Sequence, residues 1–206
     1  MPRVSKQQSL SNRATITQTA ARLFREHGIQ GISVADLMAA AGLTHGGFYG
    51  HFASKDALAA EACSLAFENS AQRWRQRLAG IAAPDAAKAL LVQGYLSSKS
   101  RDDPGISCPA SSLAGDVARE GSGAAVRAEF ASGIEALVEI LGSLQHTGNP
   151  AGDRHEALAD LATMVGAQLL ARATGGRKVS DEFLRAARTR LGSPRKRRRA
   201  PARHVE

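Results

Sequence analysis

Apolar residues recur along most of the chain at the three- and four-residue spacing of one helix face. The first such stripe begins at Ile16 and continues four, seven and eight positions later, at Ala20, Leu23 and Phe24. The most regular stripe comes later and consists of Val126, Phe130, Ile134, Leu137, Leu141 and Leu144. Beyond Ser54 the spacing stays helical throughout, so the pattern predicts a chain built from helices.

Capping residues and prolines divide this pattern into about nine helices, three or four short ones followed by five longer ones. The first is expected from Ser11 to Gly28, after a mobile basic arm at residues 1–10. Later helices are expected to begin at the caps Ser33, Thr44, Ser54 and Ser180, at the pair Asp153 and Glu156, and at Pro84 and Pro109. The helix after Pro84 is expected to break at 101–105, and the chain after Gly192 to be disordered.

Composition agrees with an all-α fold. The 206 residues include 39 Ala and 20 Leu but only 7 Ile and 9 Val, so strong helix formers outnumber β-branched residues. With 43% hydrophobic and 22% charged residues, the chain is expected to be globular. No apolar run approaches the roughly 20 residues of a membrane span, and no apolar secretory segment is visible.

Several classes of protein are excluded by what the motifs lack. The two cysteines, Cys63 and Cys108, form no CxxC pair and no disulfide framework, which favours a reducing, cytoplasmic setting. No Walker loop, GxGxxG, HExxH or nucleophile elbow is present, so we expect no enzyme, no catalytic residues and no cofactor. His45 and His51 lack the accompanying ligands of a metal site, so none is expected.

The net charge of +8 is concentrated at the C-terminal end. Residues 185–206 hold 9 basic and 1 acidic side chains, whereas residues 1–184 hold 18 of each. Residues 1–56 carry 6 basic and 3 acidic side chains, a modest excess of +3. The tail is therefore predicted to aid affinity for a polyanion, while any specific recognition must come from elsewhere.

A helix-turn-helix pattern occupies residues 33–52, SVADLMAAAGLTHGGFYGHF. It contains a short capped helix, a tight turn at residues 41–43, and a second short helix. Gly42 would supply the positive φ that the turn requires. This arrangement places a second helix in the major groove of DNA.

From Arg13 to Leu58 the chain resembles the DNA-binding domain of the TetR family of transcriptional regulators. The matching elements are the helix ending in Leu23, Phe24 and Gly28, then Ser33–Leu37, Ala41–Thr44, Phe48–Phe52 and Ser54–Leu58. The resemblance implies a three-helix DNA-binding domain at 10–56, an effector-binding and dimerisation domain at 57–192, and a basic tail at 193–206. It also implies a transcriptional regulator, most simply a repressor that a small-molecule effector releases from a palindromic double-stranded operator.

The resemblance implies the DNA-contacting residues. Tyr49 and Lys55 match family positions that contact phosphates, and Thr44 at a helix N-terminus suits an anion. The full predicted set is Thr44, His45, Gly46, Gly47, Tyr49, His51 and Lys55. His45 would reach a base edge, whereas Phe48 and Phe52 are expected to be core. The basic arm with Arg3, Lys6 and Arg13 is expected to add phosphate or minor-groove contacts.

The C-terminal helices are expected to form a homodimer and to bind the effector, which the composition predicts to be small and apolar. The candidate effector residues are Phe67, Trp74, Tyr95, Cys108, Phe130, Met164 and Gln168, each of which also suits plain core packing. The candidate dimer residues are Leu158, Leu161, Val165, Leu169, Phe183, Leu184 and Leu191.

Two alternatives remain open at this point. Cys108 precedes Pro109 and so occupies a helix N-cap, where the thiol pKa is lowered. It follows a polar loop expected to be accessible, which makes an electrophile- or redox-sensing repressor conceivable, although a structural cysteine is the simpler interpretation. A non-specific nucleic-acid binder driven by residues 195–199 is the other alternative. No membrane partner is expected.

Overall fold

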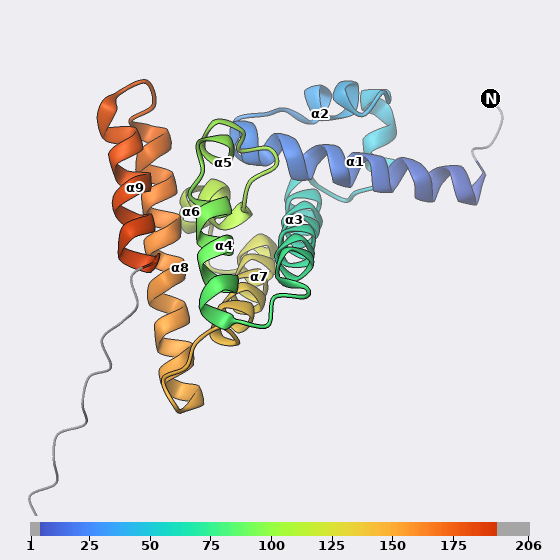
Figure 1. Cartoon of the computed structure of the whole chain (residues 1–206). Helices are drawn as coiled ribbons and strands as arrows, with labels where there is room; N and C mark the ends of the chain where they lie inside the picture. The colour runs from blue at the N-terminus through green and yellow to red at the C-terminus, as the bar shows by residue number, and fades with distance from the viewer. Residues whose placement is uncertain (1–4, 193–206) are drawn as a thin grey trace, which may run out of the picture.

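The computed structural model describes residues 5–192, which are helical with no strand (Figure 1). The helices are α1 Lys6–His27, α2 Val34–Ala40, η1 His45–Gly50, α3 Lys55–Leu78, α4 Pro84–Tyr95, α5 Ser98–Asp102, α6 Pro109–Arg119, α7 Ala125–Gly142, α8 Pro150–Ala173 and α9 Lys178–Gly192. The prediction of an all-α chain is confirmed. None of the helices in this range is long and apolar enough to span a bilayer. The predicted disorder of the tail lies outside the described residues.

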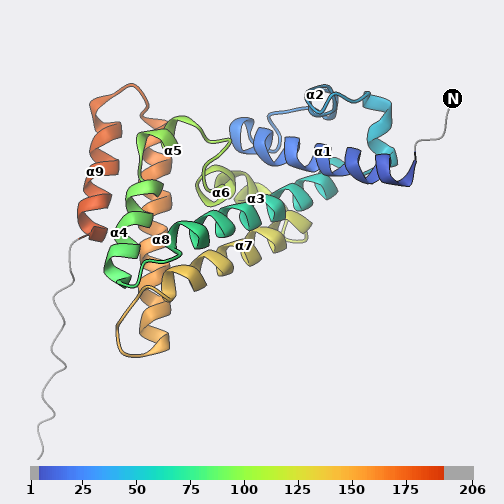
Figure 2. The same cartoon turned by 45° about the vertical axis from the view of Figure 1, so that its right-hand side comes forward.

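A small N-terminal unit holds α1, α2 and η1 at one end of the molecule, and α3 leads from it into the larger body (Figures 1 and 2). The predicted stripe of α1 is buried, because Ile16, Ala20 and Phe24 face α2 and α3. Since α3 is one continuous helix across residues 56 and 57, the N-terminal unit is rigidly connected to the rest. The domain limits given above stay a prediction.

The larger body is built around two helix pairs. Helix α3 packs along α7, and α8 pairs with α9 at the far side, while α7 and α8 also touch (Figure 2). The α3–α7 contact is close because Gly133 lies against the ring of Phe67, where an added Cβ would come within 2.1 Å of Cγ. The core is continuous from the N-terminal unit into this body.

Three predicted helix starts are corrected by the structure. Helix α1 begins at Lys6, since the Ser5 hydroxyl accepts from Gln8 N at 3.1 Å, so residues 6–10 are helical and not part of a mobile arm. Helix α8 is capped by Asn149, which accepts from Gly152 N at 2.8 Å, and not by Asp153. Ser180 lies inside α9, where its hydroxyl donates to the Ala171 carbonyl at 2.7 Å.

The expected break at 101–105 is also placed differently. Helix α4 ends at Tyr95, and Ser97 caps the extra short helix α5, accepting from Ser100 N at 3.1 Å. The described residues therefore contain ten helices, one more than predicted. By contrast, Pro84 and Pro109 both open helices as predicted.

The N-terminal unit is tied to the body through α6. Asp116 of α6 accepts from Ile29 N at 3.2 Å, just after α1 ends at Gly28, whose φ is +81°. Arg25 of α1 donates to the carbonyl of Ser107 at 2.9 Å. Arg172 of α8 donates to the hydroxyl of the same Ser107. The segment leading into α6 is thus held from both sides, by α1 and by α8.

Candidate nucleic-acid interface

The first helix of the helix-turn-helix, α2, is capped at its N-terminus by Ser33. The Ser33 hydroxyl accepts from Asp36 N at 3.1 Å and donates to the Asp36 carboxylate at 2.6 Å. The turn follows at Gly42, whose φ is +71° and whose N–H donates to the Ala39 carbonyl at 3.0 Å. Because only glycine adopts this φ without strain, the predicted role of Gly42 is confirmed.

The second helix differs from the prediction because η1 is a 3₁₀ helix and not an α-helix. Thr44 is its N-terminal flanking residue, but its side chain makes no capping hydrogen bond. The backbone carbonyl of Thr44 instead accepts from Gly47 N at 3.0 Å. Two central glycines and a run of only six residues favour this tighter, shorter form.

Aromatic packing fixes η1 against the N-terminal core. Phe48 is fully buried and stacks on Phe52 with ring centroids 5.7 Å apart, so both are core residues as expected. Tyr49 meets Phe48 edge-on at 5.2 Å, yet Tyr49 remains 69% exposed. The phenol is therefore braced at its ring and presented to solvent at its hydroxyl, the orientation that a phosphate contact requires.

Arg13 does not extend from an arm, as had been expected. It lies in α1, donates to the His51 carbonyl and to the Glu61 carboxylate, and sits 4.2 Å above the ring of Phe52. It therefore ties the end of η1 to α1 and α3. His51 is half-buried at this junction, which suits an orienting role.

The remaining predicted DNA residues share one exposed stretch. Thr44, His45 and Gly46 are exposed, and Gly47 is half-buried. Lys55 is the half-buried first residue of α3, which Ser54 caps by accepting from Ala57 N at 3.0 Å. The structure thus presents a phenol, an imidazole, a hydroxyl and an ammonium from η1 and its flanks. Neutral and cationic donors suit a phosphate backbone, and the exposed carboxylate of Asp56 follows Lys55 in the first turn of α3.

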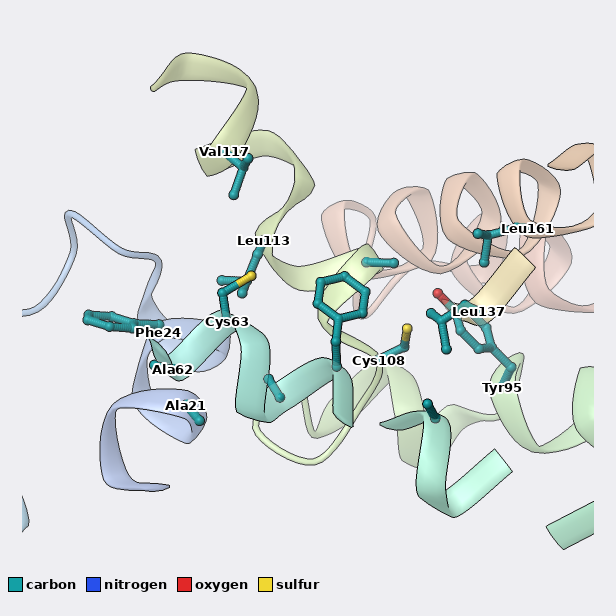
Figure 3. Close-up of a cluster of buried hydrophobic side chains, with 14 of the residues drawn as sticks. Ala21, Phe24, Ala62, Cys63, Tyr95, Cys108, Leu113, Val117, Leu137 and Leu161 are labelled. Carbon is teal, nitrogen blue, oxygen red and sulfur yellow. The ribbon is translucent and has the colours of Figure 1, made fainter. Parts of the chain in front are cut away.

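The candidate effector residues lie inside the body. All but Phe130 are buried, and they form two separate aromatic pairs, Phe67 with Phe130 at 5.2 Å and Trp74 with Tyr95 at 6.0 Å. Tyr95 points toward Cys108 and Leu137 (Figure 3). Met164 and Gln168 are buried on the inner face of α8.

Cys108 is at the N-cap of α6 as predicted, but it is neither accessible nor acidic. Its exposed fraction is 7%, and burial raises the pKa of the thiol. The N–H of Ala110 lowers the pKa, as the N-cap argument requires, and so do the hydroxyls of Tyr95 and Ser70 and the guanidinium of Arg73. Burial outweighs them because a thiolate loses its hydration there. Cys63 is buried core, as expected, and burial raises its pKa to about 12.

The candidate dimer residues fall into two groups. Leu161, Leu184 and Leu191 are buried within the protomer, because they face its own core. Leu158 and Leu169 are 43% and 49% exposed on the opposite face of α8. Val165 and Phe183 are half-buried.

Several residues of this region were not singled out by the sequence. Leu170 and Val179 are further exposed apolar side chains on α8 and α9. Arg172 donates to the carbonyls of Ser100, Arg101 and Ser111 and to the hydroxyls of Ser107, Ser111 and Ser112. A lone arginine near the end of a helix carries no sequence signal for such a role.

Comparison with known proteins agrees with this geometry. Residues 16–62 match the family model described as bacterial regulatory proteins, tetR family. The chain is 36% identical over 69 residues to the HTH-type transcriptional regulator AcrR of Shigella flexneri, covering 34% of this chain and 32% of that protein. It is 34% identical over 116 residues to the HTH-type transcriptional repressor Rv1474c of Mycobacterium tuberculosis, covering 52% and 60%. The match thus spans about one third and three fifths of these curated relatives.

Solved structures extend the likeness to nearly the whole chain. A TetR transcriptional regulator from Chloroflexus aurantiacus superposes with a TM-score of 0.73 at 27% identity, covering 90% of this chain and 94% of that one. AibR, solved with isovaleryl coenzyme A and operator DNA, superposes with a TM-score of 0.62 at 18% identity, covering 89% and 99%. These are folds of transcriptional regulators and not of enzymes. Residues 16–62, which include the helix-turn-helix, therefore match the DNA-binding domain of the tetR family, and the chain as a whole has the fold of TetR regulators.

Proposed function

We propose that this protein is a homodimeric repressor that binds a palindromic operator through η1 and releases it when a small effector enters the helical body. The observation that carries the proposal is the braced, outward-facing Tyr49 on η1, directly after a turn at Gly42. Residues 193–206, which hold six basic and one acidic side chains, lie outside the described residues, and the proposal does not rest on them.

An apolar stripe on the outer face of α8 supports dimerisation. Its members recur at helical spacing, and they are Leu158, Ala162, Val165, Gly166 and Leu169. Nothing lies within 4 Å of a Cβ added at Gly166, and Leu170 beside the stripe is 46% exposed. Exposed apolar residues gathered along one face mark an interface. A twofold partner on this face would set two η1 elements at the spacing of a palindrome.

Coupling between effector and DNA would pass through the segment before α6. Ser107 is bonded both by Arg172 of α8 and by Arg25 of α1. A ligand that displaces this segment changes the position of α1 and hence of η1. For release to follow, the ligand must bind the non-DNA conformation more tightly than the DNA-bound one.

Selection of operator sequences from a random DNA pool tests the proposal. The purified protein should enrich one palindromic sequence, and Tyr49→Ala and Lys55→Ala should each weaken binding to it by about tenfold, the scale of one lost charge-assisted contact. Lys178→Ala, which removes the same charge from the far helix α9, is the matched control and should bind as the wild type does. No enrichment, or equal binding by all variants, would refute the proposal.

A cluster of arginines near Cys108 supports a second candidate function, a thiol-sensing repressor. Arg25, Arg73 and Arg172 converge on residues 106–108, and none of the three forms an ion pair among the described residues. Such a cationic setting would stabilise a thiolate at Cys108 once the segment opens. A Cys108→Ser variant that releases operator DNA with an electrophile as the wild type does would rule this candidate out.

A further inference from the structure

Buried polar atoms without a hydrogen-bond partner are rare in folded proteins, and here they concentrate in two residues. Both amide atoms of Gln168 and the hydroxyl of Tyr95 are fully buried and make no hydrogen bond of normal geometry within the described residues. The Tyr95 hydroxyl lies against the Ser111 hydroxyl and the Cys108 thiol, whereas the Gln168 amide has no hydrogen-bond partner in the described part of the chain. An unpaired buried group of this kind destabilises the folded state, because it loses its hydrogen bonds to water without replacing them. The Gln168 amide therefore destabilises the free protein, whereas leucine would fill a similar volume without that cost.

The two residues belong to one region of the interior. Tyr95 lies beside Ser111, and Arg172 donates to the Ser111 carbonyl and hydroxyl at 3.0 and 3.3 Å. Gln168 precedes Arg172 by one turn on the same helix. The unpaired hydroxyl and the unpaired amide thus flank the contact between α8 and the start of α6.

The surroundings of this region are apolar on one side and cationic on the other. The ring of Trp74 meets Tyr95 edge-on, and Leu137 and Leu161 lie beside the phenol (Figure 3). On the other side, burial lowers the pKa of the Arg172 guanidinium, and Arg25 has its pKa lowered to about 10. Neither guanidinium has a carboxylate within ion-pair distance among the described residues.

These contacts decide the chemistry of a ligand. The hydroxyl of Tyr95 and the amide N–H of Gln168 are donors, and the uncompensated guanidiniums favour negative charge nearby. The apolar side chains suit an alkyl body. A cationic head would meet like charge and is disfavoured.

We propose that the buried pair Tyr95 and Gln168 forms the head-group site of the effector, and that the effector is a small alkyl carboxylate. The inference rests on the proposed function, because it names the ligand that would release the repressor. It also gives the Tyr95 hydroxyl and the Gln168 side-chain N–H an acceptor, because the carboxylate oxygens accept from both. The ligand would bind one turn from Arg172 and thus next to the segment that Arg172 and Arg25 hold.

Thermal unfolding of the full chain without DNA tests the inference. Sodium salts of straight-chain carboxylates from butanoate to decanoate are the probes, with octylamine and octanol for comparison. At a hundredfold excess over the Kd, at least one carboxylate should raise the midpoint of the wild type by roughly 5 °C. Octylamine should give no such rise, and octanol a smaller one.

Two variants separate recognition from stability. Tyr95→Phe and Gln168→Leu should unfold at the same or a higher temperature than the wild type without ligand, yet bind the carboxylate at least about tenfold more weakly. Gln93→Leu makes the same chemical change on the exposed side of α4 and should respond as the wild type does. Equal carboxylate binding by Tyr95→Phe and Gln168→Leu would overturn the inference. So would the absence of a shift with every carboxylate, or an equal shift with octylamine.

Failure of this inference is distinct from failure of the proposed function. Sequence-selective DNA binding requires no ligand, so it is measured independently of the thermal shifts. A protein that selects an operator but ignores carboxylates would overturn only the inference.

Discussion

Two glycines of η1 give a sharp test of the DNA interface. A Cβ added at Gly46 or at Gly50 would have no heavy atom within 4 Å, and neither residue has a positive φ. Neither the backbone nor the packing of the protein therefore requires glycine there. Each glycine costs about 0.5–1 kcal/mol of stability relative to alanine. We infer that the missing side chains let a partner approach the backbone closely, and the proposed partner is the floor of the major groove.

Gly46→Ala and Gly50→Ala should accordingly separate stability from DNA binding. Each should leave the free energy of unfolding unchanged or raise it by up to about 1 kcal/mol. Each should lower operator affinity by about tenfold or more, because a methyl group forces η1 away from the bases and weakens at least one base contact. Urea unfolding and fluorescence anisotropy titration at fixed salt measure the two quantities.

Gly47→Ala is the matched control in the same element, because a side chain at this predicted DNA-contacting residue would face the protein and not the DNA. Its Cβ would point inward, 3.7 Å from both Met38 Cε and Thr44 Oγ1, which is ordinary van der Waals contact. The helix-propensity change is the same, but the added methyl faces the protein. Operator affinity should therefore stay within about twofold of the wild type, a difference well below the 1.4 kcal/mol of a tenfold change. If Gly46→Ala and Gly50→Ala bind operator as tightly as Gly47→Ala, the reasoning is refuted.

Three further changes test packing, titration and assembly. Gly133→Ala should destabilise the protein by about 1–2 kcal/mol in urea unfolding, because overpacking against Phe67 outweighs the gain in helix propensity. Adding Phe67→Leu should recover part of this loss, and an unchanged stability of Gly133→Ala would contradict the close contact. Burial raises the pKa of Cys63 to about 12, so the neutral thiol contributes fully to the free energy of unfolding below its unfolded pKa of about 8.5, and this contribution is lost as pH rises toward 12. Cys63→Ala should therefore lose less stability at alkaline pH than the wild type, measured by guanidinium unfolding. An unchanged dependence of stability on pH would argue against this account. Leu169→Glu should dissociate the dimer in sedimentation, whereas a monomeric wild type would remove the assembly proposal.

The sequence predicts those features that neighbouring residues decide. Ser33 and Ser54 cap their helices and Gly42 adopts a positive φ, because each depends on a side chain or backbone within three residues. The prolines at 84 and 109 open helices for the same reason, since their fixed φ and missing N–H suit the first turn. The fold class follows equally well, because the helical spacing of apolar residues extends over the whole chain.

The sequence does not decide which of several suitable residues caps a helix. Asn149 and Asp153 both suit a cap before α8, and Asn149 caps it because Asp153 instead accepts from the N–H and hydroxyl of Thr147. Ser180 has the residue type of a cap but lies within α9, where its hydroxyl donates to the Ala171 carbonyl of α8. In both cases the outcome depends on a partner outside the helix that is being started.

The candidate site is harder to predict because its chemistry depends on burial and on missing partners. The N-cap rule correctly identifies an N–H that favours a thiolate at Cys108, but the sequence does not show that Tyr95 and Ser70 close over the sulfur. The pKa therefore shifts in the direction opposite to the one expected. The roles of Tyr95 and Gln168 likewise depend on buried neighbours that the sequence does not show. A buried polar side chain is structural where a neighbour pairs with it and points to a ligand where none does, and only the folded arrangement of α4, α6 and α8 separates the two cases.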